Sequence, residues 1–447
     1  MTDGSNPDLK QMFGLAKPIQ WDDKQKEAIA RCCDIKQRVV AVTGGAGTGK
    51  TALIREVAKQ LSAAGYTTQA STPTGKAARR VQELTGLQAM TNHRMLGYGT
   101  PTEHEETDEK TGRKTVKRLS TGPRYDRLRP LPYDTILCDE YAMVNEEINR
   151  NILSALKAGG RICVFGDANQ LKPIEEDKRL EGAPSPFMRA IEKFDGIVLD
   201  TIHRQKEGSG IAANGALILE GRMPKKTHDF DMQITSEPVK HMQEFVATNL
   251  DAGIDYSTVD HQIITCMNKS WIGTKKLNLV LQANFWHRDR PYLELPRYKY
   301  GSIDEQAPIR VQVGSKVVYT ANTYDLGDEQ SVFNGETGIV VSVNHDDGSL
   351  DVDLGDRVVT IPPILITVRP DGSVIEGDPR RNIDHAYALT THKCQGSEYK
   401  HVCYVINKST LWVQSRRNMY TAITRAREKC TLLTDMVSLA KSTKFPG

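Results

Sequence analysis

The eight residues from Gly44 to Thr51 read GGAGTGKT and stand between a short apolar run, 38–42, and a helix-compatible stretch, 52–64. In this pattern the glycines let backbone N–H groups approach phosphate oxygens, the lysine reaches the β- and γ-phosphates, and the threonine hydroxyl can hold Mg²⁺. The segment therefore predicts a nucleoside triphosphate site. Its expected nucleotide ligands are Gly44, Gly45, Ala46, Gly47, Thr48, Gly49, Lys50 and Thr51, with Thr51 also on the metal.

Two neighbouring carboxylates, Asp139 and Glu140, end the apolar run 136–138. The end of such a strand is where an open α/β sheet presents residues to its ligand. Asp139 suits Mg²⁺, and Glu140 suits activation of the water that attacks the γ-phosphate. An acidic pair at a strand end is more often a solvated terminus, but its place after the phosphate loop favours the catalytic interpretation.

Three more polar side chains are candidates for the same chemistry. Gln170 follows the apolar run 163–165 and could sense the γ-phosphate or position water, although a polar turn closed by Pro173 is the plainer alternative. Arg204 and Arg425 are candidates to stabilise charge across a domain cleft, where a guanidinium is worth on the order of 10³ to 10⁵ in rate. Single arginines are usually surface charges, but these two stand beside apolar or small residues.

A candidate for base recognition lies near the start of the chain. Residues 21–29 are typical of a helix capped by Asp22 or Asp23, and Gln25 lies in its first turn. The amide of Gln25 could pair with the adenine edge at two points, as glutamine does in nucleic-acid grooves. Taken alone, it would more often be a surface residue.

Composition limits the class of protein. The 447 residues are too many for one core, and the net charge of +3 means that any polyanion must be held by local clusters. One such cluster, 110–129, is rich in lysine and arginine. It could bind a phosphate backbone, or it could equally be a solvated insertion whose basic charges are balanced by the acidic residues before it. The eight cysteines have no metal-ligand spacing, and no leader or membrane span is evident, so we expect reduced thiols and a cytoplasmic protein.

Apolar runs alternate with amphipathic stretches through two parts of the chain. This rhythm predicts an α/β fold of parallel sheets covered by helices, in two domains. Between them, 311–362 is rich in Val and Thr and carries a hairpin-like turn at 346–348, which predicts a small antiparallel barrel inserted in the second domain. Residues 97–132 form a second, polar and turn-rich insertion.

Nine segments occur in an order that resembles the motif series of superfamily-one helicases, and most closely their 5′-to-3′ RecD/Dda-like branch. They span nearly the whole chain, and their order is far more specific than any single motif. The segments are GGAGTGKT, STPTGKAA (71–78), NHRML (92–96), CDE (138–140), GDANQLKPI (166–174), HRQ (203–205), VFNGETG (332–338), THKCQGSE (391–398) and YTAITRAR (420–427).

The resemblance implies two RecA-like P-loop NTPase domains with ATP and Mg²⁺ between them. Domain 1A would cover 1–200 with a small 1B pin insertion at about 97–132, and domain 2A would combine 201–284 with 386–447. An SH3-like β-barrel, the 2B insertion, would occupy 285–385. The resemblance adds Gly396 to the nucleotide ligands and places these residues on nucleic acid: Thr72, Pro73, Thr74, His93, Asn334, Thr391, His392 and Lys393.

The implied activity is an ATP-dependent helicase and translocase moving 5′ to 3′ on single-stranded DNA, in phage or bacterial replication, recombination or repair. Its partners would be single-stranded and forked DNA, with replication or single-strand-binding proteins as further candidates and no membrane. A small, self-sufficient monomeric motor is expected, because the amino-terminal extension of longer RecD relatives is missing. The chain departs from the family in Tyr141-Ala142-Met143, in Cys394 and in its strongly charged 1B insertion.

Other functions compete with this interpretation. A small-molecule kinase could use the same phosphate loop, but it would need no second α/β domain carrying Arg425. A clamp that merely binds ATP would have no use for Glu140 as a water-activating group. RNA stays open as a substrate, because contacts to the backbone and stacking on bases do not recognise the 2′-hydroxyl. Displacement of proteins without strong unwinding is a further alternative.

Overall fold

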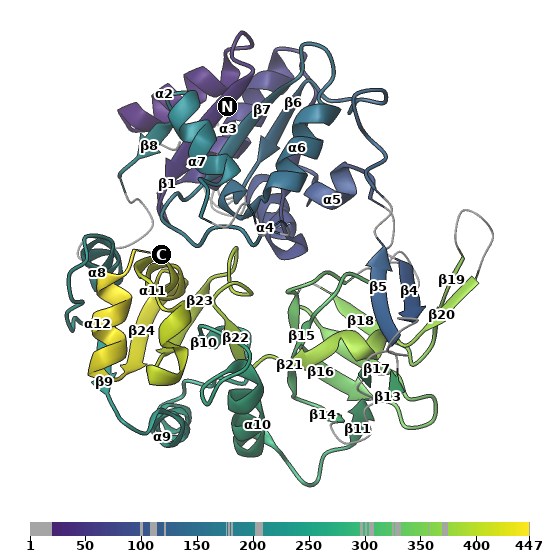
Figure 1. Ribbon diagram of the computed structural model, residues 1–447, viewed down its shortest axis with the longest axis vertical. Coiled ribbons are helices and arrows are strands. Elements are labelled where there is room, and N and C mark those ends of the chain that lie inside the picture. The colour runs from purple at the N-terminus through teal and green to yellow at the C-terminus, as the bar shows by residue number, and fades with distance from the viewer. Residues whose placement is uncertain are drawn as a thin grey trace, which may run out of the picture.

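Two α/β lobes and a β-rich unit make up the molecule (Figure 1). The first lobe lies at the top of Figure 1, the second at the lower left and the β-rich unit at the lower right. The computed structural model describes residues 20–98, 102–107, 114–119, 122–175, 177, 179, 182–201, 209–295, 298–299, 302–303, 308–323, 326, 332–355, 357–368 and 374–446.

The first lobe is built on a six-stranded sheet of order β3-β2-β6-β7-β1-β8, in which every pairing is parallel. Its strands are β1 (Val39–Gly44), β2 (Thr68–Thr72), β3 (Ala89–Thr91), β6 (Thr135–Cys138), β7 (Arg161–Gly166) and β8 (Ile197–Leu199). Its helices are α2 (Asp23–Cys33), α3 (Lys50–Ala63), α4 (Gly75–Thr85), α5 (Asn92–Met95), α6 (Glu146–Ala155) and α7 (Pro186–Lys193). Because β1 and β6 flank β7, their carboxyl ends present residues at one edge of the sheet.

Helix α3 shows how the phosphate loop is anchored. It begins after Gly49, whose φ of 87° lies in the left-handed region that favours glycine. One face of α3 is buried in the core with β1 and β7, and each large apolar side chain on that face contributes about 1.5 to 3 kcal/mol. That face carries Leu53, Ile54, Val57, Ala58 and Leu61.

The second lobe repeats the design with a five-stranded parallel sheet of order β22-β10-β23-β24-β9. Its strands are β9 (Phe230–Ile234), β10 (His261–Thr265), β22 (Ala388–Thr390), β23 (Tyr399–Val405) and β24 (Ala426–Thr434). Its helices are α8 (Gly210–Leu219), α9 (Pro238–Asp251), α10 (Thr274–Phe285), α11 (Arg416–Ile423) and α12 (Met436–Lys444). The prediction of two parallel α/β sheets is confirmed. In the described part of the chain, no helix is both long and apolar enough to cross a bilayer.

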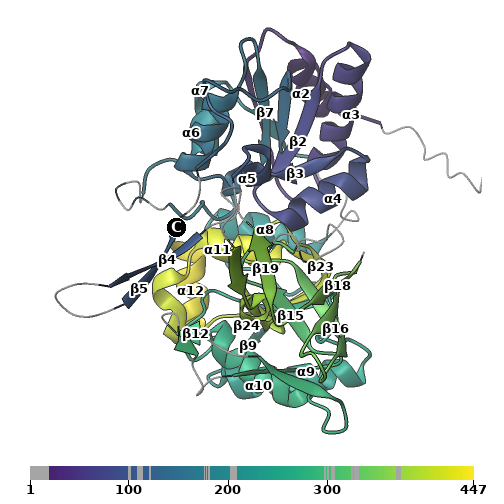
Figure 2. The same ribbon diagram turned by 90° about the vertical axis from the view of Figure 1, so that its right-hand side faces the viewer.

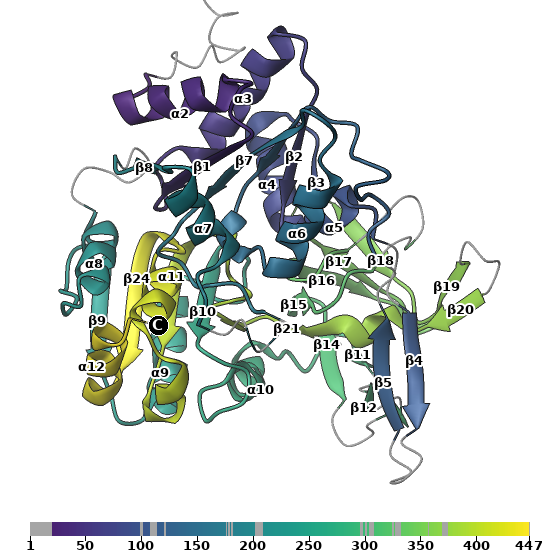
Figure 3. The ribbon, with the colours of Figure 1, turned by 45° about the horizontal axis from the view of Figure 1, so that its top comes forward.

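The β-rich unit interrupts the second lobe between α10 and β22 (Figure 3). Its main sheet is antiparallel, of order β18-β17-β16-β15-β21, with strands β15 (Lys316–Tyr319), β16 (Thr337–Val343), β17 (Leu350–Asp353), β18 (Val358–Ile361) and β21 (Ile383–His385). The smaller pairs are β11 (Tyr292–Leu295) with β14 (Ile309–Gln312), β12 (Tyr298–Lys299) with β13 (Ser302–Ile303), and β19 (Leu365–Val368) with β20 (Val374–Gly377). The predicted turn at 346–348 joins β16 to β17, with Gly348 at φ 75°. Likeness to an SH3 barrel stays a prediction.

The first insertion contains a single described hairpin. Strand β4 (Thr102–Thr107) pairs antiparallel with β5 (Lys114–Leu119), and the hairpin extends away from the sheet of the first lobe (Figure 2). The 108–113 connection, which holds part of the predicted basic cluster, lies outside the described residues. The role of this hairpin as a strand-separating pin also stays a prediction.

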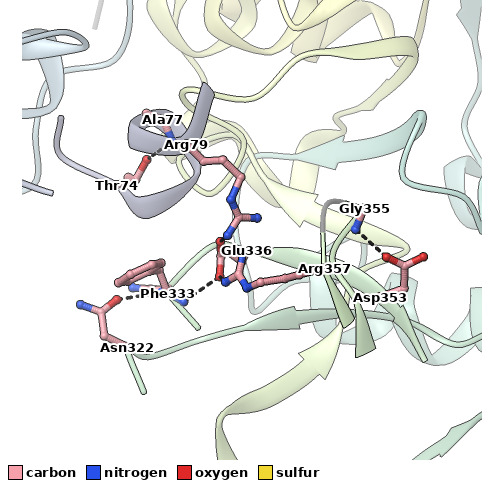
Figure 4. Close-up of polar contacts among 10 residues, drawn as sticks. Thr74, Ala77, Arg79, Asn322, Phe333, Glu336, Asp353, Gly355 and Arg357 are labelled. Carbon is pink, nitrogen blue, oxygen red and sulfur yellow. Dashed lines mark hydrogen bonds and ion pairs between the residues drawn. The ribbon is translucent and has the colours of Figure 1, made fainter. Parts of the chain in front are cut away.

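The β-rich unit is fixed to the first lobe through α4 (Figure 4). Glu336, only 2% exposed, forms ion pairs with Arg79 of α4 at 2.7 Å and with Arg357 of its own unit at 3.2 Å. The ring of Phe333 lies directly on Gly75, where a Cβ atom would come within 2.4 to 2.5 Å of three Phe333 carbons. Only glycine therefore permits this approach.

We predict that Gly75→Ala destabilises the protein by about 1 to 3 kcal/mol, because the new methyl group overpacks the contact with Phe333. Helix propensity alone would predict the opposite sign. Urea denaturation measures the change, with Gly377→Ala as control, since a Cβ there meets nothing within 4 Å. Equal stability of the two variants would contradict the close contact, and Phe333→Ala should partly rescue Gly75→Ala.

Candidate functional site

The phosphate loop connects β1 to α3 and is shaped by glycines. Gly47 and Gly49 have φ values of 83° and 87°. A Cβ atom on Gly44 would come within 2.5 Å of the Thr48 hydroxyl and 2.9 Å of Leu199. The Lys50 ammonium donates to the carbonyl oxygens of Gly44 at 2.6 Å and Gly45 at 2.9 Å, so it lies over the loop. Backbone N–H groups and one cation thus converge where an anion would bind.

The acidic pair lies at the carboxyl end of β6. Asp139 is 6% exposed, and burial, reinforced by the neighbouring Glu140 and opposed by Lys50, raises its pKa to about 6. Glu140 donates its backbone N–H to Asp139 Oδ1 at 2.8 Å. Its φ of 52° is a left-handed conformation that costs a non-glycine residue about 1 to 3 kcal/mol. Its Oε2 atom is buried and has no hydrogen-bond partner among the described residues, as expected of a carboxylate kept for a ligand or water.

A cavity of about 290 Å³ unites five of the six candidate catalytic residues, namely Lys50, Asp139, Glu140, Gln170 and Arg425. The first lobe supplies the loop, the acidic pair and Gln170, and the second lobe supplies Gly396 and Arg425. Arg425 is 3% exposed and is held by the carbonyl oxygens of Thr421 at 3.1 Å and Ser397 at 3.4 Å. The predicted residues that line this cavity are Ala46, Gly47, Gly49, Lys50, Thr51, Asp139, Glu140, Gln170, Gly396 and Arg425.

Magnesium with a nucleotide fits this donor set. Thr51 and Asp139 offer oxygen atoms on one cavity, and Mg²⁺ is usually held by one or two such groups together with phosphates rather than by a protein cage. In keeping with this, the described residues contain no group of three or more histidine, cysteine or acidic side chains that could hold a metal alone.

Gln25 does not lie where the predicted pairing with adenine would require it. Its Nε2 donates to the Thr48 carbonyl at 3.1 Å, and its Oε1 accepts from the backbone N–H of Asp22 at 3.1 Å. The side chain is 3% exposed and does not line the cavity, so it joins α2 to the phosphate loop. Pairing with adenine would require the amide to leave both partners, and that role stays a prediction. Arg204, the remaining candidate catalytic residue, lies outside the described residues.

A second cavity of about 290 Å³ lies where both lobes meet the β-rich unit. Of the predicted nucleic-acid ligands it brings together Thr74, Asn334, His392 and Lys393. Burial lowers the pKa of His392, which favours the neutral ring. The cavity is also lined by Lys76, Met143, Lys172, Pro173, Ile174, Gly335, Gln395 and Ser397.

Four predicted ligands do not line this second cavity. Thr72 and Thr391 are fully buried: the Thr72 hydroxyl donates to the Thr74 carbonyl at 2.8 Å, and that of Thr391 to Asn418 Oδ1 at 2.8 Å. His93 lies in α5 with its ring 5.0 Å from that of Tyr98, and burial lowers its pKa. Pro73 stands between Thr72 and the cap of α4. The two threonines therefore shape the segments that carry the lining residues.

Comparisons with known proteins agree with this geometry. The profile of a family described as an AAA domain matches residues 20–237, and that of a UvrD-like helicase C-terminal domain matches residues 385–433. The ATP-dependent RecD2 DNA helicase of Deinococcus radiodurans is 31% identical over 395 residues, covering 88% of this chain and 46% of that protein. The RecD subunit of the RecBCD enzyme of Mycolicibacterium smegmatis is 24% identical over 95% of this chain and 72% of its own length.

The chain is thus similar in sequence to RecD-type helicases. Its fold is similar to that of Pif1 helicases. A Pif1 structure on DNA unwinding at forked double-stranded DNA superposes with a TM-score of 0.58 at 18% identity, covering 93% of this chain and 92% of the other. Bacteroides Pif1 with ADP-AlF3 and single-stranded DNA gives 0.57 at 19%, covering 96% and 95%. The chain spans about half the length of the RecD2 relative.

Several residues that line the second cavity are not predicted from the sequence. Lys172 and Ile174 follow Gln170 closely, and the side chain of Ile174 is 72% exposed although it is apolar. Ile174 and Met143 add apolar side chains to a cavity that is also lined by lysines. The sequence analysis predicts a role only for Gln170 in the segment 170–174, although an isoleucine just after a strand-end turn is a signal for a second role.

We predict that Glu140→Gln retains ATP binding but lowers the hydrolysis rate by a factor of 10² or more, as for the loss of a general base. The neutral amide keeps the shape of the side chain and cannot take a proton from water. Titration with a fluorescent ATP analogue and steady-state phosphate release measure the two quantities. Glu192→Gln, at an exposed position of α7, is the control. Hydrolysis at the parental rate by Glu140→Gln would remove this residue from the mechanism.

Proposed function

We propose that the protein is an ATP-driven DNA helicase that moves 5′ to 3′ along single-stranded DNA and separates forked duplexes. The observation that carries the proposal is that three short segments each line both cavities. The turn and helix at 74–80 line the second cavity through Thr74 and the nucleotide cavity through Ala77. The loop after β7 does so through Lys172 and Gln170, and the loop after β22 through Lys393 and Gly396.

The hydrolytic step follows from the residues of the nucleotide cavity. Lys50 and Arg425 would neutralise charge on the transferring phosphoryl group from opposite lobes, and Glu140 would orient and deprotonate water. Bound Mg²⁺ would supply further charge neutralisation next to Asp139 and Thr51. Because the two lobes share the cavity, hydrolysis and release of phosphate would change the force that holds them together. A single-domain kinase would not need this arrangement, and a passive clamp would not need Glu140.

The second cavity supports a single strand as the track. Lys76, Lys172 and Lys393 offer cations for backbone phosphates, while Met143 and Ile174 offer apolar surface for bases. Contacts to phosphates and apolar contacts to base faces carry little sequence information, so binding through these groups would be tolerant of sequence. Opening one base-pair step costs about 1.4 kcal/mol of stacking, a small load for a motor that consumes ATP.

The direction of movement, the preference for DNA over RNA and the cellular setting are inferred from the related proteins. The Deinococcus relative is named as a DNA helicase, one Pif1 structure is bound to single-stranded DNA, and another concerns unwinding at forked double-stranded DNA. We extend these properties to this chain, with the hairpin β4–β5 as pin, the β-rich unit as an SH3-like 2B domain, and domain limits at about residues 200, 285 and 385. A cytoplasmic monomer with replication or single-strand-binding proteins as partners completes the proposal.

Unwinding of tailed duplexes tests the proposal. Substrates with a 5′ or a 3′ single-stranded tail, made of DNA and of RNA, are incubated with the chain with and without ATP. We expect separation of the 5′-tailed DNA alone, only with ATP, and none by Lys50→Ala, which lacks the phosphate-loop cation. Separation of only 3′-tailed duplexes would reverse the direction, and separation of RNA alone would change the substrate. Strand-stimulated hydrolysis without separation would favour displacement of proteins.

We predict that Lys172→Ala and Lys393→Ala each weaken binding to oligo-dT and make it less sensitive to salt. Each lost phosphate contact should reduce the slope of log affinity against log salt by about 0.7. Fluorescence anisotropy at several salt concentrations measures both effects. Lys36→Ala, exposed in the turn after α2, is the control. An unchanged slope for both cavity variants would exclude this cavity as the phosphate track.

A further inference from the structure

One helix of the second lobe grips the loop that carries Gln170. Helix α11 turns a single face toward residues 167–171, with Arg417, Tyr420 and Thr421 at positions i, i+3 and i+4. Arg417 Nη1 donates to the carbonyl oxygens of Ala168 at 2.5 Å and of Gln170 at 3.1 Å. The Thr421 hydroxyl accepts from the Leu171 backbone N–H at 3.0 Å. The backbone of this loop is thus fixed to the opposite lobe.

The remaining contact between α11 and this loop is made to a side chain of the loop. The Tyr420 hydroxyl donates to Asp167 Oδ2 at 2.8 Å, and Gln170 Nε2 donates to the same oxygen at 3.4 Å. All three side chains are buried, at 6%, 1% and 4% exposure. A carboxylate oxygen shared by two donors in a buried site has little freedom to rotate. Asp167 Oδ1 is occupied as well, by the backbone N–H of Asn169 at 2.9 Å.

The orientation of Gln170 matters because the oxygen of its side-chain amide can still accept a hydrogen bond. Its Nε2 donates to Asp167, whereas its buried Oε1 has no hydrogen-bond partner in the part of the chain that the structure describes, and the residue lines the nucleotide cavity. The Tyr420 hydroxyl also lies against the phosphate loop, since a Cβ atom on Gly45 would come within 3.2 Å of it. The tyrosine therefore stands between the loop that would hold the phosphates and the loop that would sense them.

We propose that Tyr420 is a positioning residue for Gln170. Acting through Asp167, its hydroxyl fixes the amide of Gln170 toward the nucleotide cavity and makes that orientation depend on the place of the second lobe. Gln170 is then correctly aimed only when α11 is docked on the loop. The proposal rests on the ATPase function proposed above, and it adds a residue that acts on the nucleotide through Asp167 and Gln170.

The test removes one oxygen atom. Tyr420→Phe keeps the ring and its packing, and we expect kcat for strand-stimulated ATP hydrolysis to fall about tenfold with KM for ATP within about twofold. Tyr256→Phe, a buried tyrosine in the core of the second lobe, is the matched control and should leave both values unchanged. A 3-fluorotyrosine in place of Tyr420 retains the hydroxyl and should keep kcat within about twofold of the parent.

A double-mutant cycle separates positioning from a merely structural role. In a Gln170→Ala background, Tyr420→Phe should have no further effect on kcat, because the group that it positions is gone. Additive losses, or an active Tyr420→Phe variant with parental kcat, would overturn the role of Tyr420 while leaving the ATPase intact. A parental chain without strand-stimulated hydrolysis would instead overturn the proposed function, and this role with it.

Discussion

The structure depends on one constraint: neither lobe alone completes the nucleotide cavity. The first lobe contributes Lys50, Asp139 and Glu140, which can bind a phosphate and activate the water that attacks it, and the second contributes Arg425 and Gly396. A guanidinium that is 3% exposed and held by two carbonyl oxygens cannot swing far on its own, so it reaches the cavity only as its whole lobe does. Nucleotide chemistry and lobe position are therefore tied by geometry.

The same constraint extends to the second cavity because the connecting segments are short. One residue separates Gln170 from Lys172, and two separate Lys393 from Gly396, with one member of each pair on each cavity. Helix α4 adds a rigid third connection, and its position is set by Phe333 on Gly75 and by the ion pair of Arg79 with Glu336. The β-rich unit is thus a structural support of the first lobe as well as a lining of the second cavity.

The sequence predicted the parts of the site that depend on local spacing. The phosphate loop and the acidic pair each follow an apolar strand, and parallel strands bring their carboxyl ends to one edge, so Lys50, Asp139 and Gln170 had to converge. The motif order also predicted that Arg425 would come from a second lobe. In contrast, the exposure of Ile174, the burial of Thr72 and Thr391, and the engagement of both ends of the Gln25 amide arise from contacts between distant segments, which spacing does not encode. The same is true of the Tyr420–Asp167 bond, which joins residues 253 positions apart.

Movement of the lobes during turnover is the central claim, and single-molecule energy transfer tests it most directly. Labels at Lys59→Cys of α3 and Lys240→Cys of α9 would report the two lobes, with Cys33 replaced by Ser because it alone among the eight cysteines is not buried. With ATP, Mg²⁺ and single-stranded DNA, we predict alternation between two transfer efficiencies at the rate of hydrolysis, and a single efficiency for Glu140→Gln. One constant efficiency while the parental chain hydrolyses ATP would contradict the account.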